Sequence, residues 1–305
     1  MNITRRTFTK RVAEIGTGSI LALAGCTTHA GDIDPGGATR ERRSANGKSN
    51  LRRLGNTDLT LSRVGFGAQH NQDPDLIRYA LDQGINHIET SWLYGMGGPR
   101  SSCKIIGKAI SGRRDSVRLV VAYEAMVPPG KKFWLPNQFE QTLRELGTDH
   151  IDVFLWHHPG DQPPKRGLKE SQAVITAGER VELMLKWKAE GKIRWCGVTF
   201  HDDQEEWVKF VAGCGLYQVA VVAFNYNSPE KVANALREAS LKGVGVIAMK
   251  TQSPNYLATA VIGDAPDHGK ALGWVLSKEY ITAAIPGMTA REQVDLNLQT
   301  MRSAV

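Results

Sequence analysis

Residues 150–159 read H-I-D-V-F-L-W-H-H-P, and this stretch decides how the rest of the chain is interpreted. Residues 151–156 are nearly all apolar, β-branched or aromatic, which is typical of a strand buried on both faces of a parallel sheet. The apolar run stops at His157 and His158, directly before a proline. Because α/β barrels carry their chemistry at the carboxyl ends of their strands, we expect these imidazoles at a functional site.

On both sides of this stretch, strand patterns alternate with helix patterns. Strict alternation predicts a parallel sheet in the α/β class, and eight units predict a closed (β/α)8 barrel, or TIM barrel. A doubly wound open sheet is the alternative, but no G-x-G-x-x-G motif opens a helix. We expect strands at residues 62–68, 87–92, 118–124, 151–158, 195–201, 218–225, 245–250 and 282–288, and helices at 75–83, 103–110, 139–146, 179–189, 205–212, 230–239, 270–277 and 291–300.

The first 26 residues have the features of an export signal. The string T-R-R-T-F-T-K at residues 4–10 resembles a twin-arginine signal, and the apolar stretch after it is too short for a permanent membrane helix. Leu-Ala-Gly-Cys at residues 23–26 resembles a lipobox, which implies cleavage before Cys26 and a lipid anchor on its thiol. We therefore expect the twin-arginine translocase as a partner and a periplasmic or cell-envelope location. Cleavage at a nearby small residue, giving a soluble periplasmic protein, is the alternative.

After this leader, composition separates a linker from a single domain. Residues 27–50 are polar, rich in glycine and without apolar periodicity, so we expect a disordered linker. Residues 51–305 are expected to form the barrel, which opens with a β-hairpin about Gly55 and Asn56. The formal charge is +7, of which four basic residues and one acid in the leader contribute +3. The remaining surplus lies partly in the linker and favours an anionic membrane nearby over nucleic acid, which we exclude as a partner.

Polar and titratable side chains recur at the carboxyl ends of the expected strands. These ends meet at one rim of a barrel, so the groups should shift one another's pKa values. Any single one of them could equally have a structural role where a strand meets solvent. The set comprises Gln69, His70, Glu89, Tyr94, Glu124, His157, His158, His201, Asp202, Asp203, Asn225, Asn227 and Lys250.

Six segments in the same order resemble the aldo-keto reductase family. They are spread from Leu51 to about Asn297, essentially the whole domain, so the resemblance implies this family's fold and the NADP-dependent reduction of a small-molecule carbonyl substrate. The segments are R-R-L-G-N-T-D-L-T-L-S-R-V-G-F-G, I-E-T-S-W-L-Y-G, L-R-E-L-G-T-D-H-I-D-V-F-L-W-H-H-P, G-K-I-R-W-C-G-V-T, G-V-G-V-I-A-M-K-T and I-P-G-M-T-A-R-E-Q-V-D-L-N.

The resemblance implies four catalytic positions, and the chain matches two of them. Tyr94 matches the phenol that gives a proton to the carbonyl, and His157 matches the histidine that orients it. Glu89 stands where the family has aspartate, and Glu124 where it has lysine. An ionised Glu124 would raise the pKa of the phenol and oppose proton donation, unless the two glutamates share a proton.

The resemblance also implies a set of NADP-binding positions. We expect contributions from Thr199, Lys250, Gly287, Arg291 and Asn297, with Arg291 and Asn297 beside an adenosine phosphate.

Several other cofactor positions depart from the family. Phe200 replaces an asparagine, Ala223 a glutamine, Met249 an aromatic side chain that stacks on nicotinamide, and Gln293 an arginine. Each lost contact is worth on the order of 1 kcal/mol, so together these changes should weaken dinucleotide binding.

Three functions are compatible with these observations. The first is an aldo-keto reductase-type oxidoreductase with degenerate positions. The second is a non-redox barrel in which Glu89, Glu124, His157 and His201 bind a divalent metal or carry out acid–base chemistry on a sugar-like ligand. The third is a catalytically silent, lipid-anchored binding protein.

Overall fold

A computed structural model gives the architecture, and it describes residues 50–95, 98, 100–124, 135–157, 167–253 and 267–304. The expected leader with Cys26, residues 27–49 of the expected linker and His158 lie outside the described residues. Within the described ranges, no helix is long and apolar enough to cross a membrane.

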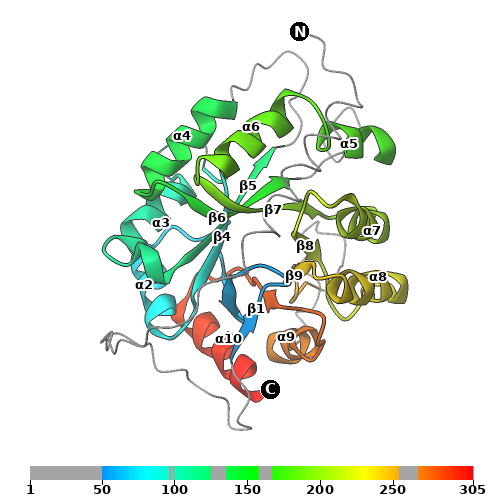
Figure 1. Cartoon of the computed structure of the whole chain (residues 1–305). Helices are drawn as coiled ribbons and strands as arrows, with labels where there is room; N and C mark the ends of the chain where they lie inside the picture. The colour runs from blue at the N-terminus through cyan, green and yellow to red at the C-terminus, as the bar shows by residue number, and fades with distance from the viewer. Residues whose placement is uncertain are drawn as a thin grey trace, which may run out of the picture. The chain divides into compact units, whose positions relative to one another are not determined.

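Eight parallel strands, β3 to β10, form one sheet in which neighbours follow one another in chain order. Two parallel bridges, Val64 with Ala284 and Gly67 with Gly287, join the segment around the first strand to the segment around the last. The sheet therefore curls into a barrel surrounded by helices, as expected (Figure 1). The strands are β3 Phe66–Gly67, β4 His87–Ser91, β5 Arg118–Glu124, β6 Ile151–His157, β7 Ile193–Phe200, β8 Val219–Ala223, β9 Gly245–Met249 and β10 Ala283–Ala284.

Helices occupy the positions between the strands that their periodicity predicts. A shorter helix, α5, is an addition that the sequence analysis did not include. The helices are α2 Pro74–Asp82, α3 Ser102–Ile110, α4 Leu135–Leu146, α5 Leu168–Val174, α6 Glu179–Ala189, α7 Gln204–Cys214, α8 Glu230–Leu241, α9 His268–Leu276 and α10 Arg291–Ser303, with a 3-10 turn at Arg114–Ser116.

The expected hairpin is present and closes the amino-terminal end of the barrel. It consists of the antiparallel strands β1 (Leu51–Arg53) and β2 (Thr60–Ser62). Leu54, Leu59 and Leu61 from this hairpin are fully buried in the cluster that fills the barrel interior. The opposite, carboxyl-terminal end is the one left for a site, because the hairpin already covers the first end.

Strand β6 shows how the apolar run serves two layers. Phe154 and Trp156 belong to the cluster that packs between the sheet and the helices. Val153 and Leu155 belong to the cluster inside the barrel. Since successive side chains of a strand point to opposite faces, His157 continues the inward row and reaches the carboxyl-terminal mouth.

The first and last strands are much shorter than expected. The sequence pattern predicts strands at residues 62–68 and 282–288, but the ladders cover only Phe66–Gly67 and Ala283–Ala284. Ser62 pairs within the hairpin instead. Pro286 has no N–H to donate, which limits the length of the last ladder.

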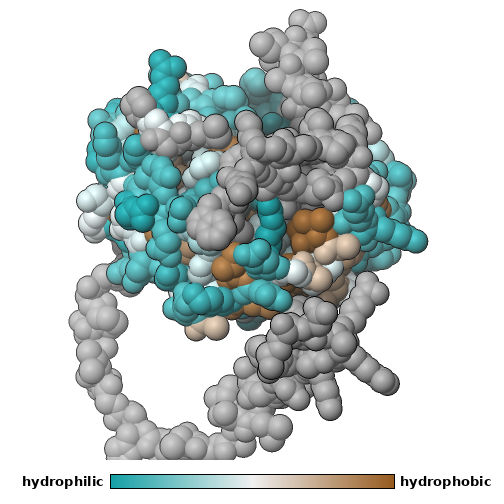
Figure 2. All heavy atoms as spheres, turned by 90° about the horizontal axis from the view of Figure 1, so that it is seen from above, coloured by the Kyte–Doolittle hydropathy of each residue, from teal (hydrophilic) through white to brown (hydrophobic). Residues whose placement is uncertain are grey.

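Apolar side chains are concentrated between these layers, and the outer surface is mainly polar. On the face that Figure 2 shows, the described residues are mostly hydrophilic, with a smaller hydrophobic patch among them. The core clusters described above therefore account for most of the large apolar side chains, and few remain exposed: Tyr226, Leu241 and Leu296 among the described residues.

Candidate active site

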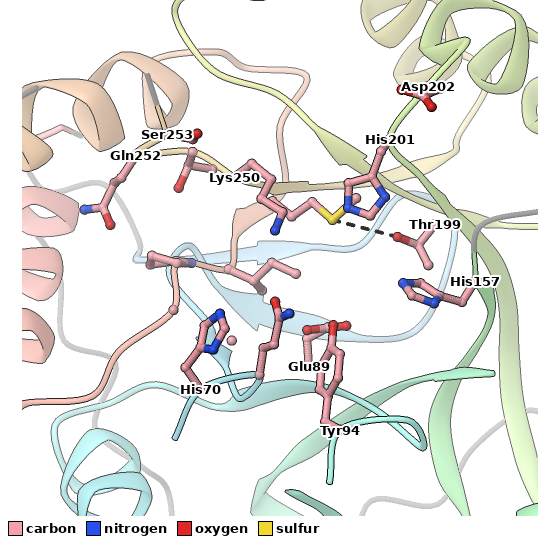
Figure 3. A pocket seen from close by; sticks show the side chains of 17 residues that line it. His70, Glu89, Tyr94, His157, Thr199, His201, Asp202, Lys250, Gln252 and Ser253 are labelled. Atoms are coloured by element: carbon pink, nitrogen blue, oxygen red, sulfur yellow. Dashed lines mark hydrogen bonds between the residues drawn. The ribbon is translucent and has the colours of Figure 1, made fainter. Parts of the chain in front are cut away.

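The carboxyl ends of the strands surround a pocket of about 600 Å³. Glu89, Tyr94, His157 and Lys250 all line it, and Figure 3 shows their side chains pointing into the same space. Three of the four expected catalytic residues therefore share one pocket. The fourth, Glu124, reaches the site through a hydrogen bond to His157.

The register of three adjacent strands places Glu124, His157 and Thr199 side by side. Glu124 on β5 pairs with His157 on β6, which in turn pairs with Thr199 on β7. Nδ1 of His157 lies 2.7 Å from Oε1 of Glu124, and both side chains are nearly buried, with 12% and 13% exposed. The charge-reversed position 124 thus forms a carboxylate–imidazole pair.

Arg180, at the start of α6, provides a positive charge behind this pair. Its Nη1 donates to the backbone oxygen of Glu124 at 3.1 Å. Burial lowers the pKa of Arg180, and the charges of Glu179 and Glu124 partly offset that effect. An ionised Glu124 therefore interacts favourably with a guanidinium as well as with an imidazole.

Glu89 lies deep in the pocket and has a different environment. Burial raises its pKa to about 7, and the ammonium of Lys250 partly opposes this. The shift comes from burial and not from Glu124, so the idea that the two glutamates share a proton does not account for it. Glu124 forms a hydrogen bond with His157, whereas the charge of Lys250 acts on Glu89 and lowers its pKa.

Tyr94 lies close to both acids. Its pKa is raised well above the ordinary value by burial first, and then by the negative charges of Glu89 and Glu124. The expected effect of the charge reversal at residue 124 is therefore present. This phenol is a weaker acid than one beside a lysine.

Lys250 is held in an uncommon backbone conformation where β9 ends. Its φ is +56°, and Asp203, beside the pocket residue Asp202, has φ +46°. Side chains other than glycine seldom adopt this left-handed region, and such residues are concentrated at functional sites. At this position the turn directs the Lys250 side chain back over the pocket (Figure 3).

Comparison with known proteins identifies the family. The model of the Aldo/keto reductase family matches residues 63–266, well over half of the chain. The chain belongs to this family. Among its relatives, methylglyoxal reductase YeaE of Escherichia coli is 27% identical over 260 residues, covering 74% of this chain and 81% of the relative. L-Galactose dehydrogenase of Arabidopsis thaliana is 24% identical over 291 residues, covering 82% and 88%.

Solved aldo-keto reductase structures share the fold. An enzyme of Klebsiella pneumoniae in complex with NADP and acetate has a TM-score of 0.62 and 24% identity, covering 83% of this chain and 89% of that one. Aldo-keto reductase AKR11C1 of Bacillus halodurans has a TM-score of 0.62 and 22% identity, covering 82% and 90%. These similarities agree with the barrel described above.

The cofactor positions expected from the family are only partly gathered at the pocket. Thr199, Lys250 and Gly287 line it, whereas Arg291 and Asn297 lie outside its lining. The guanidinium of Arg291 stacks on the Tyr79 ring, 4.9 Å from its centroid. Asn297 is buried, and its Oδ1 accepts a hydrogen bond from Nε2 of Gln252 at 2.8 Å. Both side chains therefore have partners in this structure, and their contact with an adenosine phosphate stays a prediction.

The departures from the family pattern have a structural explanation in part. Phe200 is fully buried and stacks with Trp207 of α7, with ring centroids 6.1 Å apart. Its phenyl ring therefore packs in the helix layer, and Phe200 is not among the residues that line the pocket. Met249 does line the pocket, where its sulfur accepts from the Thr199 hydroxyl at 3.9 Å.

The divalent-metal alternative has no matching ligand set in the part of the chain that the structure describes. No group of three or more His, Cys, Asp or Glu side chains is arranged there to hold a metal ion. His201 is near His157, with ring centroids 6.3 Å apart, but the acids have other neighbours.

Several residues at the site were not predicted from the sequence, and Arg180 and Gln252 are two polar examples. Arg180 begins a helix and not the end of a strand, so the strand-end pattern could not reveal it. Gln252 follows β9 by only a few residues and lines the pocket, so extending the search into that loop would have found it.

Proposed function

We propose that this chain is an NADP-dependent oxidoreductase of the aldo-keto reductase type that reduces the carbonyl group of a small molecule. The observation that carries this proposal is the convergence of Tyr94 and His157 on one pocket that extends to Lys250 and Gly287. Family membership supports it, as do a relative named methylglyoxal reductase and a related structure that contains NADP.

The residues present fit a dinucleotide at one end of the pocket. Thr199 offers a hydroxyl, Lys250 a cation, and Gly287 a backbone with open space beside it, since an added Cβ would meet nothing within 4 Å. We assign these three residues to the cofactor, with Lys250 toward a phosphate. When bound, NADPH supplies a hydride, and the protein has to supply the proton and hold the carbonyl.

We assign Tyr94 and His157, which both line the pocket, to the carbonyl oxygen. Both are hydrogen-bond donors in a partly enclosed pocket, where such bonds stabilise the charge that develops on oxygen. Glu89 and Lys250 line the same pocket and add a carboxyl group and an ammonium group to it. We expect this chain to bind NADPH more weakly than other members of the family do, because Phe200 and Ala223 offer no polar group to the cofactor.

A fluorescence titration with NADPH tests the cofactor. The chain contains 7 tryptophans, so saturable quenching is the expected result. Lys250→Met should weaken binding about tenfold, whereas Lys242→Met, an exposed lysine away from the pocket, should not change it. Consumption of NADPH with a panel of small aldehydes and ketones then tests the reaction.

The absence of saturable binding up to millimolar NADPH in this titration would refute the reductase proposal. It would favour the catalytically silent binding protein, or acid–base chemistry by Glu89 and the Glu124–His157 pair without a cofactor.

We further propose that the protein is exported and anchored by lipid at Cys26. The support is in the sequence, where paired arginines precede an apolar stretch that ends in the Leu-Ala-Gly-Cys motif. Cys26→Ser should release the protein from membranes, and Arg5→Lys with Arg6→Lys should block export by the twin-arginine translocase. A Cys26→Ser protein that stays fully membrane-bound would contradict the anchor.

A further inference from the structure

We propose that His157, paired with Glu124, is the group that donates the proton to the carbonyl oxygen, and that Tyr94 assists as a second hydrogen-bond donor. This inference rests on the reductase activity proposed above. It assigns the proton transfer within that activity to the Glu124–His157 pair. This pair can form because residue 124 is a glutamate and not a lysine.

The geometry of the pair fixes the imidazole. The Glu124 carboxylate is 2.7 Å from Nδ1 of His157, which places a proton on that nitrogen in a charge-assisted bond. Nε2 is on the opposite edge of the ring, and His157 projects into the pocket beside Thr199 (Figure 3). An imidazolium held in this way presents its second N–H toward a ligand.

The surroundings of Tyr94 make it the poorer donor of a proton. Burial and the two neighbouring acids, Glu89 and Glu124, raise the pKa of the phenol well above its ordinary range. General acids work best when their pKa is close to the working pH. Tyr94 can donate a hydrogen bond without giving up its proton.

The charged and titratable groups around His157 come from several elements. Glu124 on β5 is in contact, and Arg180 on α6 lies behind it, donating to its backbone oxygen at 3.1 Å. Glu89 on β4 and Lys250 after β9 share the pocket, and His201 after β7 lies with its ring centroid 6.3 Å from that of His157. The Glu124 carboxylate is in direct contact with the ring, and its negative charge favours the charged form of the imidazole.

In the proposed step, the carbonyl carbon gains the hydride that NADPH supplies, and the π electron pair of the C=O bond moves to oxygen. Oxygen takes the proton from Nε2 of His157, and the N–H electron pair stays on that nitrogen. The products are the alcohol, NADP⁺ and neutral His157, with Glu124 still ionised and bonded to Nδ1.

Substitutions at the two donors and at the pairing residue test this assignment in the full-length protein. His157→Gln should lower kcat at least a hundredfold, as expected for loss of a general acid. Tyr94→Phe should lower it no more than about tenfold, the effect of one hydrogen bond. The matched controls are His150→Gln and Asp149→Asn, a second histidine–carboxylate pair with Nδ1 2.6 Å from Oδ1 at the other end of β6, and both should keep wild-type kcat.

The pH dependence of kcat gives a measurement that a merely structural role of Glu124 would not move. In the wild type, kcat should fall as pH rises through the pKa of His157. Glu124→Gln keeps a hydrogen-bond acceptor but removes the charge, so the midpoint should move down by about one pH unit or more. Thermal melting followed by circular dichroism should show that this isosteric variant is folded.

The outcomes separate the two proposals. A wild-type protein that consumes no NADPH with any carbonyl refutes the reductase function, and this assignment with it. If the wild type is active but Tyr94→Phe loses more kcat than His157→Gln, the function stands and the assignment is overturned. An unchanged midpoint in Glu124→Gln would also overturn it.

Discussion

Replacing Glu89 by glutamine should change how the stability of the protein depends on pH. Burial raises the pKa of Glu89 to about 7 in the folded chain. In the unfolded chain the carboxyl group is in water, with a pKa of about 4.3. The folded protein therefore binds one more proton than the unfolded chain between these two values.

This difference decides whether the protein gains or loses stability as pH rises. The protonated form of Glu89 favours the folded state, so its contribution to the free energy of unfolding is fully present below about pH 4 and is lost as pH rises through about 7. At about 1.4 kcal/mol per pH unit, the loss is about 3 to 4 kcal/mol. Glutamine has nearly the same shape and stays neutral, so Glu89→Gln should lack this loss and should be more stable than the wild type at pH 8 by an amount of this order.

Urea unfolding followed by tryptophan fluorescence at several pH values between 4 and 8 measures the effect. The quantity of interest is the difference in unfolding free energy between Glu89→Gln and the wild type at each pH, because other titrating groups cancel in it. Glu238→Gln, an exposed glutamate on α8, should show no such trend. Parallel stability curves for Glu89→Gln and the wild type would refute the reasoning about burial.

Three further substitutions test backbone packing and a buried set of ion pairs, each through the free energy of unfolding measured in urea. Gly197→Ala in β7 should cost about 1 to 3 kcal/mol, because the new Cβ would lie 2.4 Å from the backbone oxygen of Val219; an unchanged stability would contradict the close approach. Gly213→Ala in α7 has open space and should stabilise the protein by about 0.5 to 1 kcal/mol. Asp152→Asn should destabilise it by about 3 kcal/mol, because the buried carboxylate accepts from Arg114 at 3.0 Å and Arg194 at 2.8 Å; a loss below about 1 kcal/mol would contradict a structural role for these pairs.

The fold was largely predictable because long apolar strands and amphipathic helices carry strong local patterns. The bounds of β5 at Arg118–Glu124 and of α6 at Glu179–Ala189 agree with those expected from the sequence. The strands beside the barrel closure were less predictable. Their lengths depend on a hairpin, a proline and partners that are far away in sequence.

The sequence predicted which residues lie at the carboxyl ends of the strands. It did not predict which of their side chains bond to each other. The position of Glu89, Tyr94 and His157 at one rim follows from barrel topology. The bond between Glu124 and His157 depends on the register of β5 and β6, which the sequence pattern leaves undefined. The stacking of Arg291 on Tyr79 likewise requires two helices to be adjacent.

The barrel closure also constrains how this chain can fold. The bridge from Val64 to Ala284 joins positions 220 residues apart, from the first barrel unit to the last. Until residues near 284 emerge from the ribosome, β3 and β9 each have one edge with unpaired backbone groups, and such an edge can pair with another chain. We therefore expect that closure of the barrel soon after synthesis, or a chaperone bound at these two edges, limits aggregation of the chain.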